Sequence, residues 1–544
     1  MRLAAFTLCL LLLTQTCPAQ QPGERVRLNQ TGFYPRAPKQ AVLASGQGSS
    51  FYLSPIGSPG DTLYKGTLSA PRNSAYSDKT TRIADFSAFR KPGSYVLHVP
   101  GLGSSYPFDI QANVHRSAAI ASLKGLYFQR VSVPLTPEYA GEWTHAAGHP
   151  DTEVMVHPSA ASEGRPAGTL ISAPGGWYDA GDYNKYIVNS GITMGTLLSL
   201  YEDFPALMNE LETRIPESGN GVPDLLDEVY VNLSWMLAMQ DPGDGGVYHK
   251  LTNAEFSDMV SPPARANAPR YVVQKSTAAT LDFAAVLAQA ARVYRPFDKQ
   301  FPGLADKCLS AARRAWDWAK AHPAVLYEQD EMNRRFDPDV VTGAYGDGDV
   351  KDEWIWAATE LYVSTGEESY YPATLFPNER TPVPSWSDVE WLGYYTLLRH
   401  GQSMARARQD LPTLRSELAG AAERLLEGSS GHYYATVMGG TPADFVWGSS
   451  AVAANQGILL IQNYIQTKDR RFLAGALSNL DYLLGRNATG YSFLTGMGEK
   501  TPLHPHHRLS ESDQAVAPVP GLLAGGPNPG QQDKCETYPS DTPD

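Results

Sequence analysis

The sequence predicts two folded domains, a small β-sandwich followed by a larger all-α domain whose helices form a ring. The chain has 544 residues, which is more than one ordinary hydrophobic core sustains. From about residue 25 to 110, short runs of β-branched and aromatic residues alternate with Gly, Pro, Asn and Ser. After about residue 114, apolar residues recur at helical spacing, and long Gly- and Pro-rich loops separate the segments.

The strands of the first domain are short and regularly spaced. The segments "RVRLNQTGFYP", "QAVLAS", "SFYLS" and "GSYVLHVP" each end at a turn-forming residue. Several strands at this spacing are typical of a β-sandwich. We therefore expect the sandwich to extend over residues 24–112.

The helices of the second domain show apolar faces and start signals. In "GVPDLLDEVYVNLSWMLAMQ", Pro223 suits a first turn, and Leu226, Val229 and Leu233 follow along one face. Ser276 is placed to cap the helix "STAATLDFAAVLAQAARVY". Many helices of similar length favour a helical toroid over residues 113–544 with its function in the loops.

Composition limits the classes of function. Hydrophobic residues make up 42% of the chain and charged residues 19%, as in a folded globular protein. The formal net charge is −13. Nucleic-acid binding needs an excess of Lys and Arg near phosphates, so we expect no nucleic-acid partner.

The N-terminus resembles an export signal. Arg2 precedes an apolar run that is too short to span a bilayer, and small residues surround Ala19. A buried helix is the alternative, but the position favours a signal peptide over residues 1–19. We expect a secreted or periplasmic monomer with no membrane contact after its removal. Cys308 and Cys535 would then remain, and their pairing stays open.

The stretch "PGGWYDAGDYNKYIVNSG" places Asp179 and Asp182 three residues apart. A turn in which both acids bond backbone amides is one interpretation. Aromatic residues surround the pair, however, and rings beside paired carboxylates suit the binding and cleavage of sugars. Glycoside hydrolysis needs a carboxylate base and a carboxylic acid on opposite sides of the bond. Two acids this close would serve one side by holding and deprotonating a water, so the proton donor must come from elsewhere.

A second polar cluster lies in "YSFLTGMGEKTPLHPHHRLS". His504, His506, His507 and Arg508 occupy one loop. A metal site and a solvated surface loop are alternatives, although no nearby cysteine or acid has metal-ligand spacing. Imidazole and guanidinium groups also suit the binding of sugar hydroxyls.

A third cluster, "YGDGDVKDEW", brings Asp347, Asp349, Asp352 and Glu353 close together before a helix. Four acids repel one another unless they are solvated or share a cation. Calcium takes carboxylate and carbonyl oxygens, which such a loop can supply. A solvated helix start, where acids favour the dipole, is the alternative.

Together these motifs resemble glycoside hydrolase family 9, in the branch that carries an N-terminal immunoglobulin-like domain. The resemblance covers nearly all of the expected mature chain. It rests on the start "RVRLNQTGFYP", on the Asp pair, on the run from Ser492 to Arg508, and on "DGGVYHKL", "DYLLGRNATGYSF" and "LLAGGPNPGQQDKC".

The resemblance implies an (α/α)6 barrel with an open cleft that cleaves β-1,4-glucans, mainly cellulose, with inversion. It implies that Asp182 is the general base and that Asp179 helps to hold the water. Calcium would bind at Asp352 and Glu353, with Asp349 as a further candidate. The other implied positions contact sugar, namely His506, Arg508, His249, Trp447 and Tyr183.

The chain departs from the family at a zinc site. Many relatives with this first domain bind zinc through cysteines and histidines ahead of the Asp pair. Here Val131 and Gly148 stand at the matching positions, and only His149 remains. Without thiolates the tetrahedral site is incomplete, so we expect no zinc.

A second departure concerns the proton donor, which in the family is a Glu in an Asn-Glu motif beyond "GGPNPG". No such motif follows before Asp544, and Glu536 lies too early. We expect truncation rather than a protein without its donor, and slow hydrolysis of unactivated glucans by the chain as written. Exo-acting enzymes of the same family, including glucosaminidases and β-glucosidases, and a glycan-binding protein without activity are the alternatives.

Overall fold

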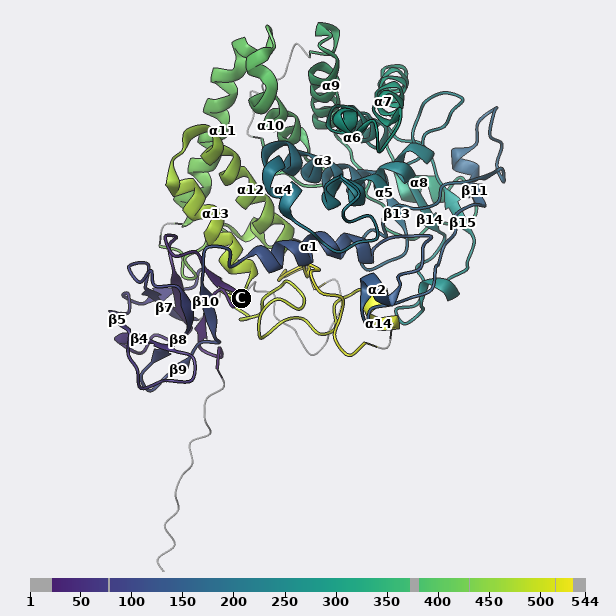
Figure 1. The fold of residues 1–544 in the computed structure, drawn as a ribbon. Helices are drawn as coiled ribbons and strands as arrows, with labels where there is room; N and C mark the ends of the chain where they lie inside the picture. Colours follow the sequence, from purple (N-terminus) through teal and green to yellow (C-terminus); the bar gives the residue numbers. More distant parts are fainter. Residues whose placement is uncertain (1–21, 77–78, 372–380, 430, 514, 532–544) are drawn as a thin grey trace, which may run out of the picture.

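The computed structural model describes residues 22–76, 79–371, 381–429, 431–513 and 515–531. The predicted signal peptide, Cys535 and Glu536 lie outside these ranges. Two bodies make up the described chain, a β-sandwich and a larger helical domain (Figure 1). In this part of the chain, no helix combines the length and apolar character needed to cross a bilayer.

The first domain consists of two sheets that face one another. The first has the order β1 (Val26–Arg27), β3 (Gln40–Leu43), β7 (Thr80–Asp85) and β6 (Arg72–Asn73). The second has the order β2 (Gly32–Phe33), β10 (Phe108–Ile110), β8 (Gly93–Val99), β4 (Ser50–Pro55) and β5 (Tyr64–Thr67), and β9 (Gly103–Ser104) pairs with β8. Alternate residues of β8, Tyr95, Leu97 and Val99, are buried between the sheets, as the two-residue period of a strand dictates.

The second domain is built from long helices that surround a common core, as the sequence predicts. They are α1 (Arg116–Phe128), α3 (Ile187–Asp203), α5 (Asp224–Ala238), α6 (Thr277–Tyr294), α7 (Leu304–Ala321), α9 (Lys351–Thr365), α10 (Glu390–His400), α11 (Ala407–Ser429), α12 (Ser449–Thr467) and α13 (Arg470–Leu483). Shorter helices are α2 (Pro137–Ala140), α4 (Pro205–Glu210), α8 (Gln329–Asn333) and α14 (Arg508–Ser512).

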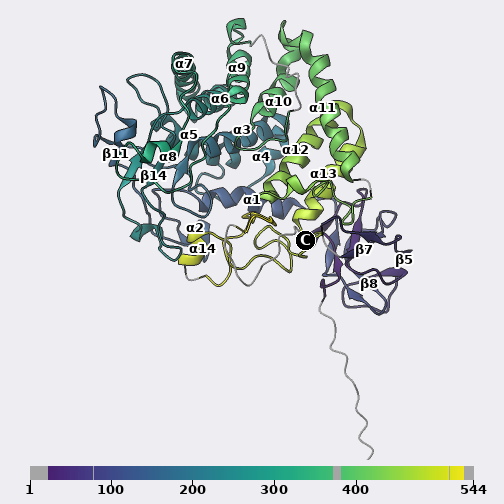
Figure 2. The same ribbon diagram turned by 180° about the vertical axis from the view of Figure 1, so that it is seen from behind.

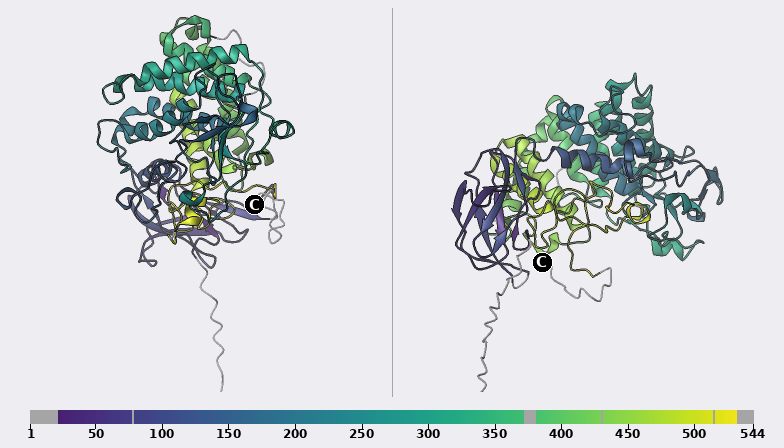
Figure 3. Two further views of the ribbon diagram at one scale, coloured as in Figure 1. Left: turned by 90° about the vertical axis from the view of Figure 1, so that its right-hand side faces the viewer. Right: turned by 60° about the horizontal axis from the view of Figure 1, so that its bottom comes forward.

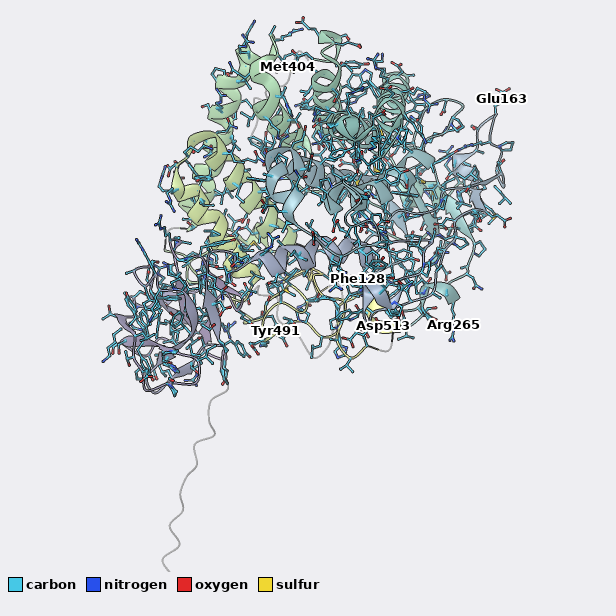
Figure 4. All side chains as sticks on the ribbon, in the orientation of Figure 1. Phe128, Glu163, Arg265, Met404, Tyr491 and Asp513 are labelled. Atoms are coloured by element: carbon cyan, nitrogen blue, oxygen red, sulfur yellow. The ribbon has the colours of Figure 1, made fainter. Side chains whose placement is uncertain are left out.

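Helix α6 lies at the centre of the packing between α3, α7 and α9. All but one of its residues are buried, and many of them are alanines that let the neighbouring helices approach closely. The Ser276 hydroxyl accepts a hydrogen bond from the Ala279 amide at 3.2 Å, so the predicted cap is present. Side chains fill the space between the helices (Figure 4).

A small sheet borders the loops at one side of the helical domain. Its order is β12 (Leu170–Ile171), β11 (Val154–Val156), β15 (Arg270–Val272), β14 (Lys250–Asn253) and β13 (Lys185–Tyr186). The loop from β12 to β13 carries Asp179 and Asp182. The sheet therefore fixes both ends of the acidic motif.

Polar side chains join the sandwich to the helical domain, where the sandwich lies against α13 (Figure 2). Asn29 Nδ2 donates to the Asp481 carboxylate at 2.9 Å, and Arg486 pairs with the same carboxylate at 2.9 Å. Burial raises the pKa of Asp481 to about 6 against the attraction of Arg486, and it lowers the pKa of Arg486. The free energy lost by removing both charges from water thus exceeds the free energy gained from their mutual attraction. Removing only one of the two groups is nevertheless destabilising, because it leaves the other charge buried without a partner.

We expect Asp481→Ala to destabilise the protein by about 3–5 kcal/mol, because the buried Arg486 guanidinium loses its counter-charge. Chemical denaturation measures this change in the free energy of unfolding. Asp317→Ala is the matched control, since Asp317 pairs with Lys320 at the surface of α7 and such pairs contribute at most about 1 kcal/mol. Equal losses in both variants would contradict this assignment.

Candidate active site

The loop that carries the acidic pair is fixed by two contacts to its backbone. Gln129 Nε2 donates to the Ala180 carbonyl at 2.9 Å, and Arg508 Nη1 donates to the Gly181 carbonyl at 2.8 Å. A side chain at Gly181 would collide with the His506 carbonyl oxygen, which lies 1.8 Å from the position of its Cβ. The acidic motif and the histidine-rich motif, distant in sequence, therefore lie directly against one another.

The histidine-rich motif belongs to a C-terminal segment that runs beneath α1. It extends from Tyr491, on the side of the sandwich, towards Asp513, close to α2 (Figures 1 and 4). His507 anchors the segment through a 3.0 Å contact between its Nε2 and Gln129 Oε1. Since Gln129 also holds Ala180, one side chain links α1, the acidic loop and the C-terminal segment.

Asp182 has one oxygen held by the protein and one without a protein partner. Its Oδ2 accepts hydrogen bonds from Asn184 Nδ2 at 2.7 Å and from the Tyr186 hydroxyl at 2.8 Å. Its Oδ1 accepts none from the residues that the structure describes. A carboxylate oriented in this way can accept a proton from a water, as a general base must.

Asp179 accepts a hydrogen bond at each oxygen, from Asn189 Nδ2 at 2.8 Å and from the Tyr345 hydroxyl at 3.1 Å. Burial, followed by the charge on Asp182, raises its pKa to about 7, while the bonds from Asn189 and Tyr345 oppose this rise. The Asp182 carboxylate is therefore close enough for its charge to raise the pKa of Asp179.

A buried layer supports Tyr345 from behind. Lys250 Nζ donates to the Gly343 carbonyl at 2.7 Å, and the His249 ring bonds to the Ala344 carbonyl at 2.9 Å. Burial lowers the pKa of Lys250 to about 7 and that of His249 to about 3. Lys250, the first residue of β14, and His249, which directly precedes this strand, therefore position the loop that carries Tyr345, whose hydroxyl bonds to Asp179.

Three of the predicted sugar contacts are buried in the structure. His249 and Tyr183 are buried, and the Tyr183 hydroxyl donates to the Ser261 carbonyl at 2.7 Å. Arg508 is also buried and donates to the carbonyls of Ser257 and Gly181. Their hydrogen bonds to backbone carbonyls hold the surrounding loops, and contact of these three residues with sugar stays a prediction.

The two other predicted sugar contacts are accessible. His506 is exposed beside Gly181. The Trp447 side chain lies just before α12 and is 62% exposed. Both remain candidates for binding sugar.

A cavity of about 230 Å³ borders Asp179 between α1, α3 and the C-terminal segment. Aromatic and polar side chains line it, among them Trp177, Tyr178, Tyr186 and Asn189. Aromatic walls with a few polar groups are typical of a site for a sugar or another small ligand.

The acid-rich stretch lies at the start of α9, against α6. Asp352 Oδ2 accepts a hydrogen bond from the Val389 amide at 2.6 Å, and Glu353 Oε2 is buried without a partner among the described residues. Asp282 of α6 is fully buried, and neither of its oxygens has a partner there. Burial and the charges of neighbouring acids raise the pKa of both Asp282 and Glu353.

Within the described ranges, no three acidic, histidine or cysteine side chains converge as the ligands of a metal would. Asp349 is exposed, and its carboxylate accepts a hydrogen bond from the Lys351 amide at 3.1 Å. The orphaned oxygens of Asp282 and Glu353 nevertheless show that this region holds more acceptors than protein donors.

The sequence left four supporting residues unassigned. Tyr345 is the first residue of the acid-rich motif, and Asn184 lies two residues after Asp182. Both could therefore have been predicted as site residues from their proximity to a motif. Asn189 lies in the same quoted stretch as the acidic pair, at the start of α3, whereas Gln129 at the end of α1 had no such signal. Their roles depend on contacts that only the fold creates.

Comparison with known proteins identifies the chain. The family model described as glycosyl hydrolase family 9 matches residues 115–542, and that of the cellulase N-terminal ig-like domain matches residues 21–104. The chain belongs to glycosyl hydrolase family 9. The predicted immunoglobulin-like sandwich and (α/α)6 barrel are thereby confirmed.

Relatives of this family 9 chain are named as glucanases. It is 45% identical over 529 residues to the xyloglucan-specific endo-beta-1,4-glucanase of Bacteroides ovatus, covering 96% of this chain and 89% of that protein. It is 32% identical to endoglucanase D of Acetivibrio thermocellus, covering 94% of this chain and 79% of that protein. The protein is thus a glycoside hydrolase of the endo-1,4-β-glucanase type.

Solved structures agree with this assignment. The structure titled Bacteroides ovatus GH9 matches with a TM-score of 0.90 and 44% identity, covering 96% of this chain and 95% of that one. A metagenome-derived family 9 endoglucanase matches with a TM-score of 0.85 and 34% identity, covering 95% of this chain and 93% of that one.

Proposed function

We propose that this family 9 hydrolase cleaves internal β-1,4 bonds of a glucan main chain with inversion at the anomeric carbon. The observation that carries the proposal is the unpartnered Oδ1 of Asp182 beside the fixed carboxyl group of Asp179. Asp182 would take a proton from a water that Asp179 also holds. The water would attack the anomeric carbon from the side opposite the leaving oxygen, which a separate acid protonates.

We propose a xyloglucan main chain as the substrate to test first, because a relative with 45% identity is named as xyloglucan-specific. The experiment compares xyloglucan, unbranched mixed-linkage glucan, cellulose and chitosan oligomers. A rapid fall in viscosity relative to the release of reducing ends on xyloglucan would support the proposal. Release of single sugars from the ends of chitosan or cello-oligomers would contradict it and favour an exo-acting enzyme.

Calcium is a proposed structural ion at the start of α9. Asp352 and Glu353 would supply carboxylate oxygens, with Asp349 as a further candidate, and backbone carbonyls would complete the set that calcium prefers. The buried, unpartnered Glu353 Oε2 fits this chemistry. When bound, the ion would offset the repulsion among these acids.

We expect EDTA to lower the melting temperature and added calcium to restore it, because a ligand that binds only the folded state stabilises it. Glu353→Gln should melt at the same temperature with and without EDTA. Glu331→Gln, at an exposed position on α8, is the control that keeps the EDTA effect. A wild-type melting temperature that changes neither with EDTA nor with added calcium would contradict the proposal.

We also propose that the protein holds no zinc ahead of the Asp pair. Val131 packs with Tyr178 and Tyr183 in a buried apolar cluster, and a Cβ at Gly148 would meet the backbone of Pro263. His149 bonds to the Tyr178 hydroxyl at 2.7 Å. Elemental analysis of the purified protein tests this proposal.

Export to the periplasm or beyond remains part of the proposal, on the strength of Arg2 and the apolar run that follows it. The N-terminal residue of protein recovered from cell fractions tests it. A mature chain that begins near Gln20 would support export, whereas an intact Met1 in the cytoplasm would contradict it.

A further inference from the structure

A groove between the two domains differs in charge from the rest of the molecule. It has a volume of about 860 Å³ and lies between the sandwich and the first half of α13. Figure 3 shows the sandwich resting against this part of the helical domain. Arg36 and Arg90 line it from the sandwich, and Arg470 lines it from α13.

The three guanidinium groups lack protein counter-charges. No acidic side chain lines the groove in the described part of the chain. None of the three arginines pairs with a carboxylate among the described residues, whereas the neighbouring Arg471 pairs with Glu423 at 2.7 Å. Three like charges that form no ion pair within the described ranges give this groove a positive potential, in a protein whose net charge is −13.

The groove is also structurally fixed. Lys39 is fully buried, and its Nζ donates to the carbonyls of Pro35 and Ala37 at 2.9 Å each, which holds the loop that presents Arg36. Burial, followed by the charge of Arg90, lowers the pKa of Lys39 to about 8, and the charge of Asp85 opposes this change. The hydrogen bond from Asn29 of the sandwich to Asp481 of α13 joins the two domains that form the walls.

One wall of the groove is apolar. Leu473, Ala474 and Leu477 of α13 are half-buried and face it, and the ring of Tyr34 lies on the sandwich side. Aliphatic and aromatic surfaces suit the C–H faces of a pyranose, and guanidinium groups bind carboxylates through paired hydrogen bonds. A volume of this size is within the range of ligand sites in proteins.

We propose that this groove binds a carboxylate-bearing oligosaccharide, one that contains uronic acid residues, and that this site is separate from the catalytic one. The apolar wall receives the sugar rings, and Arg36, Arg90 and Arg470 receive the carboxylates. A neutral glucan offers no counter-charge for the three guanidinium groups, so the catalytic substrate is not the expected occupant.

The test measures binding of oligogalacturonate by isothermal titration calorimetry to the full-length protein and to a triple variant, Arg36→Gln, Arg90→Gln and Arg470→Gln. We expect the triple variant to bind about tenfold more weakly or not at all, and we expect added salt to weaken binding to the wild type. Arg471→Gln, which removes a paired arginine from the same helix end, is the control and should bind like the wild type.

Two further ligands separate the possible outcomes. Cello-oligosaccharide should bind the wild type and the triple variant equally, and hydrolysis of neutral glucan should be unchanged. Equal affinity of the wild type for inorganic polyphosphate and oligogalacturonate would overturn the assignment to a saccharide. Equal affinity of the triple variant and the wild type for oligogalacturonate, or no binding by either, would overturn the site itself.

Discussion

Asp182→Asn is expected to abolish hydrolysis while leaving glucan binding largely intact. An amide cannot take the proton of the attacking water, so a rate loss of at least about 10²–10⁴-fold is expected. The hydrogen bonds from Asn184 and Tyr186 require only an acceptor oxygen, which asparagine retains. The loss should therefore fall on kcat, with a small change in KM.

The measurement uses β-cellobiosyl fluoride, because fluoride leaves without a proton and the rate then reports on the base alone. Proton NMR of the first product should show the α-anomer, as inversion requires. Asp258→Asn, at an exposed position near Ser257, removes a charge from a neighbouring loop and should keep the wild-type rate. An active Asp182→Asn enzyme would remove this residue from the role of base.

The acidic pair could be predicted from sequence because its signal is local. Asp179 and Asp182 stand within one short loop, among glycines and aromatic residues that suit a sugar site. The sandwich and the helical domain could also be predicted from the sequence, since the periodicity of strands and helices can be recognised in short stretches of residues. Such features depend on neighbours along the chain.

In contrast, the sequence does not predict which acceptor a polar side chain will bond to in the folded protein. The prediction that Arg508 contacts sugar did not include its hydrogen bond to the Gly181 carbonyl, which lies 2.8 Å from its guanidinium group. His249 faces the Ala344 carbonyl for the same reason, although the two residues are 95 positions apart. A donor binds whichever acceptor the fold brings near, and sequence alone does not reveal that acceptor.

The burial of acidic side chains is a second feature that could not be predicted from the sequence. Asp282 lies among the alanines of a helix that reads as an ordinary core element. Its burial beside Glu353 emerges only when α6 and α9 pack together. Conversely, four acids in sequence between Asp347 and Glu353 do not converge on one point, since Asp349 turns to the surface.

Asp179→Asn is expected to lower activity and to raise stability, with the gain in stability growing as pH rises. Burial raises the pKa of Asp179 to about 7 in the folded protein, from the ordinary value of 3.8 that applies in the unfolded chain. Between these values the folded protein retains a proton that the unfolded chain releases. Ionisation therefore favours the unfolded chain increasingly up to pH 7, and an uncharged amide removes this penalty.

Each pKa unit corresponds to about 1.4 kcal/mol, so the variant should gain about 1–4 kcal/mol at pH 8 and little at pH 4. Part of the gain is lost because asparagine keeps one acceptor oxygen for the two donors, Asn189 and Tyr345. Urea denaturation at both pH values measures the difference from wild type. The variant must be compared with the wild type at each pH, because burial also raises the pKa of Asp227 to about 7. The stability of both proteins therefore depends on pH through Asp227 as well.

Activity should fall by about 10²-fold in the same variant, because the attacking water loses one of its two anchors and small displacements are costly. Asp258→Asn again serves as the control, and it should change neither stability nor rate. A gain in stability that is equal at pH 4 and pH 8 would contradict the charge argument. Full activity would show that Asp182 positions the water alone. The stability gain and the rate loss together therefore test whether this buried carboxyl group, which destabilises the fold when it is charged, is retained for catalysis.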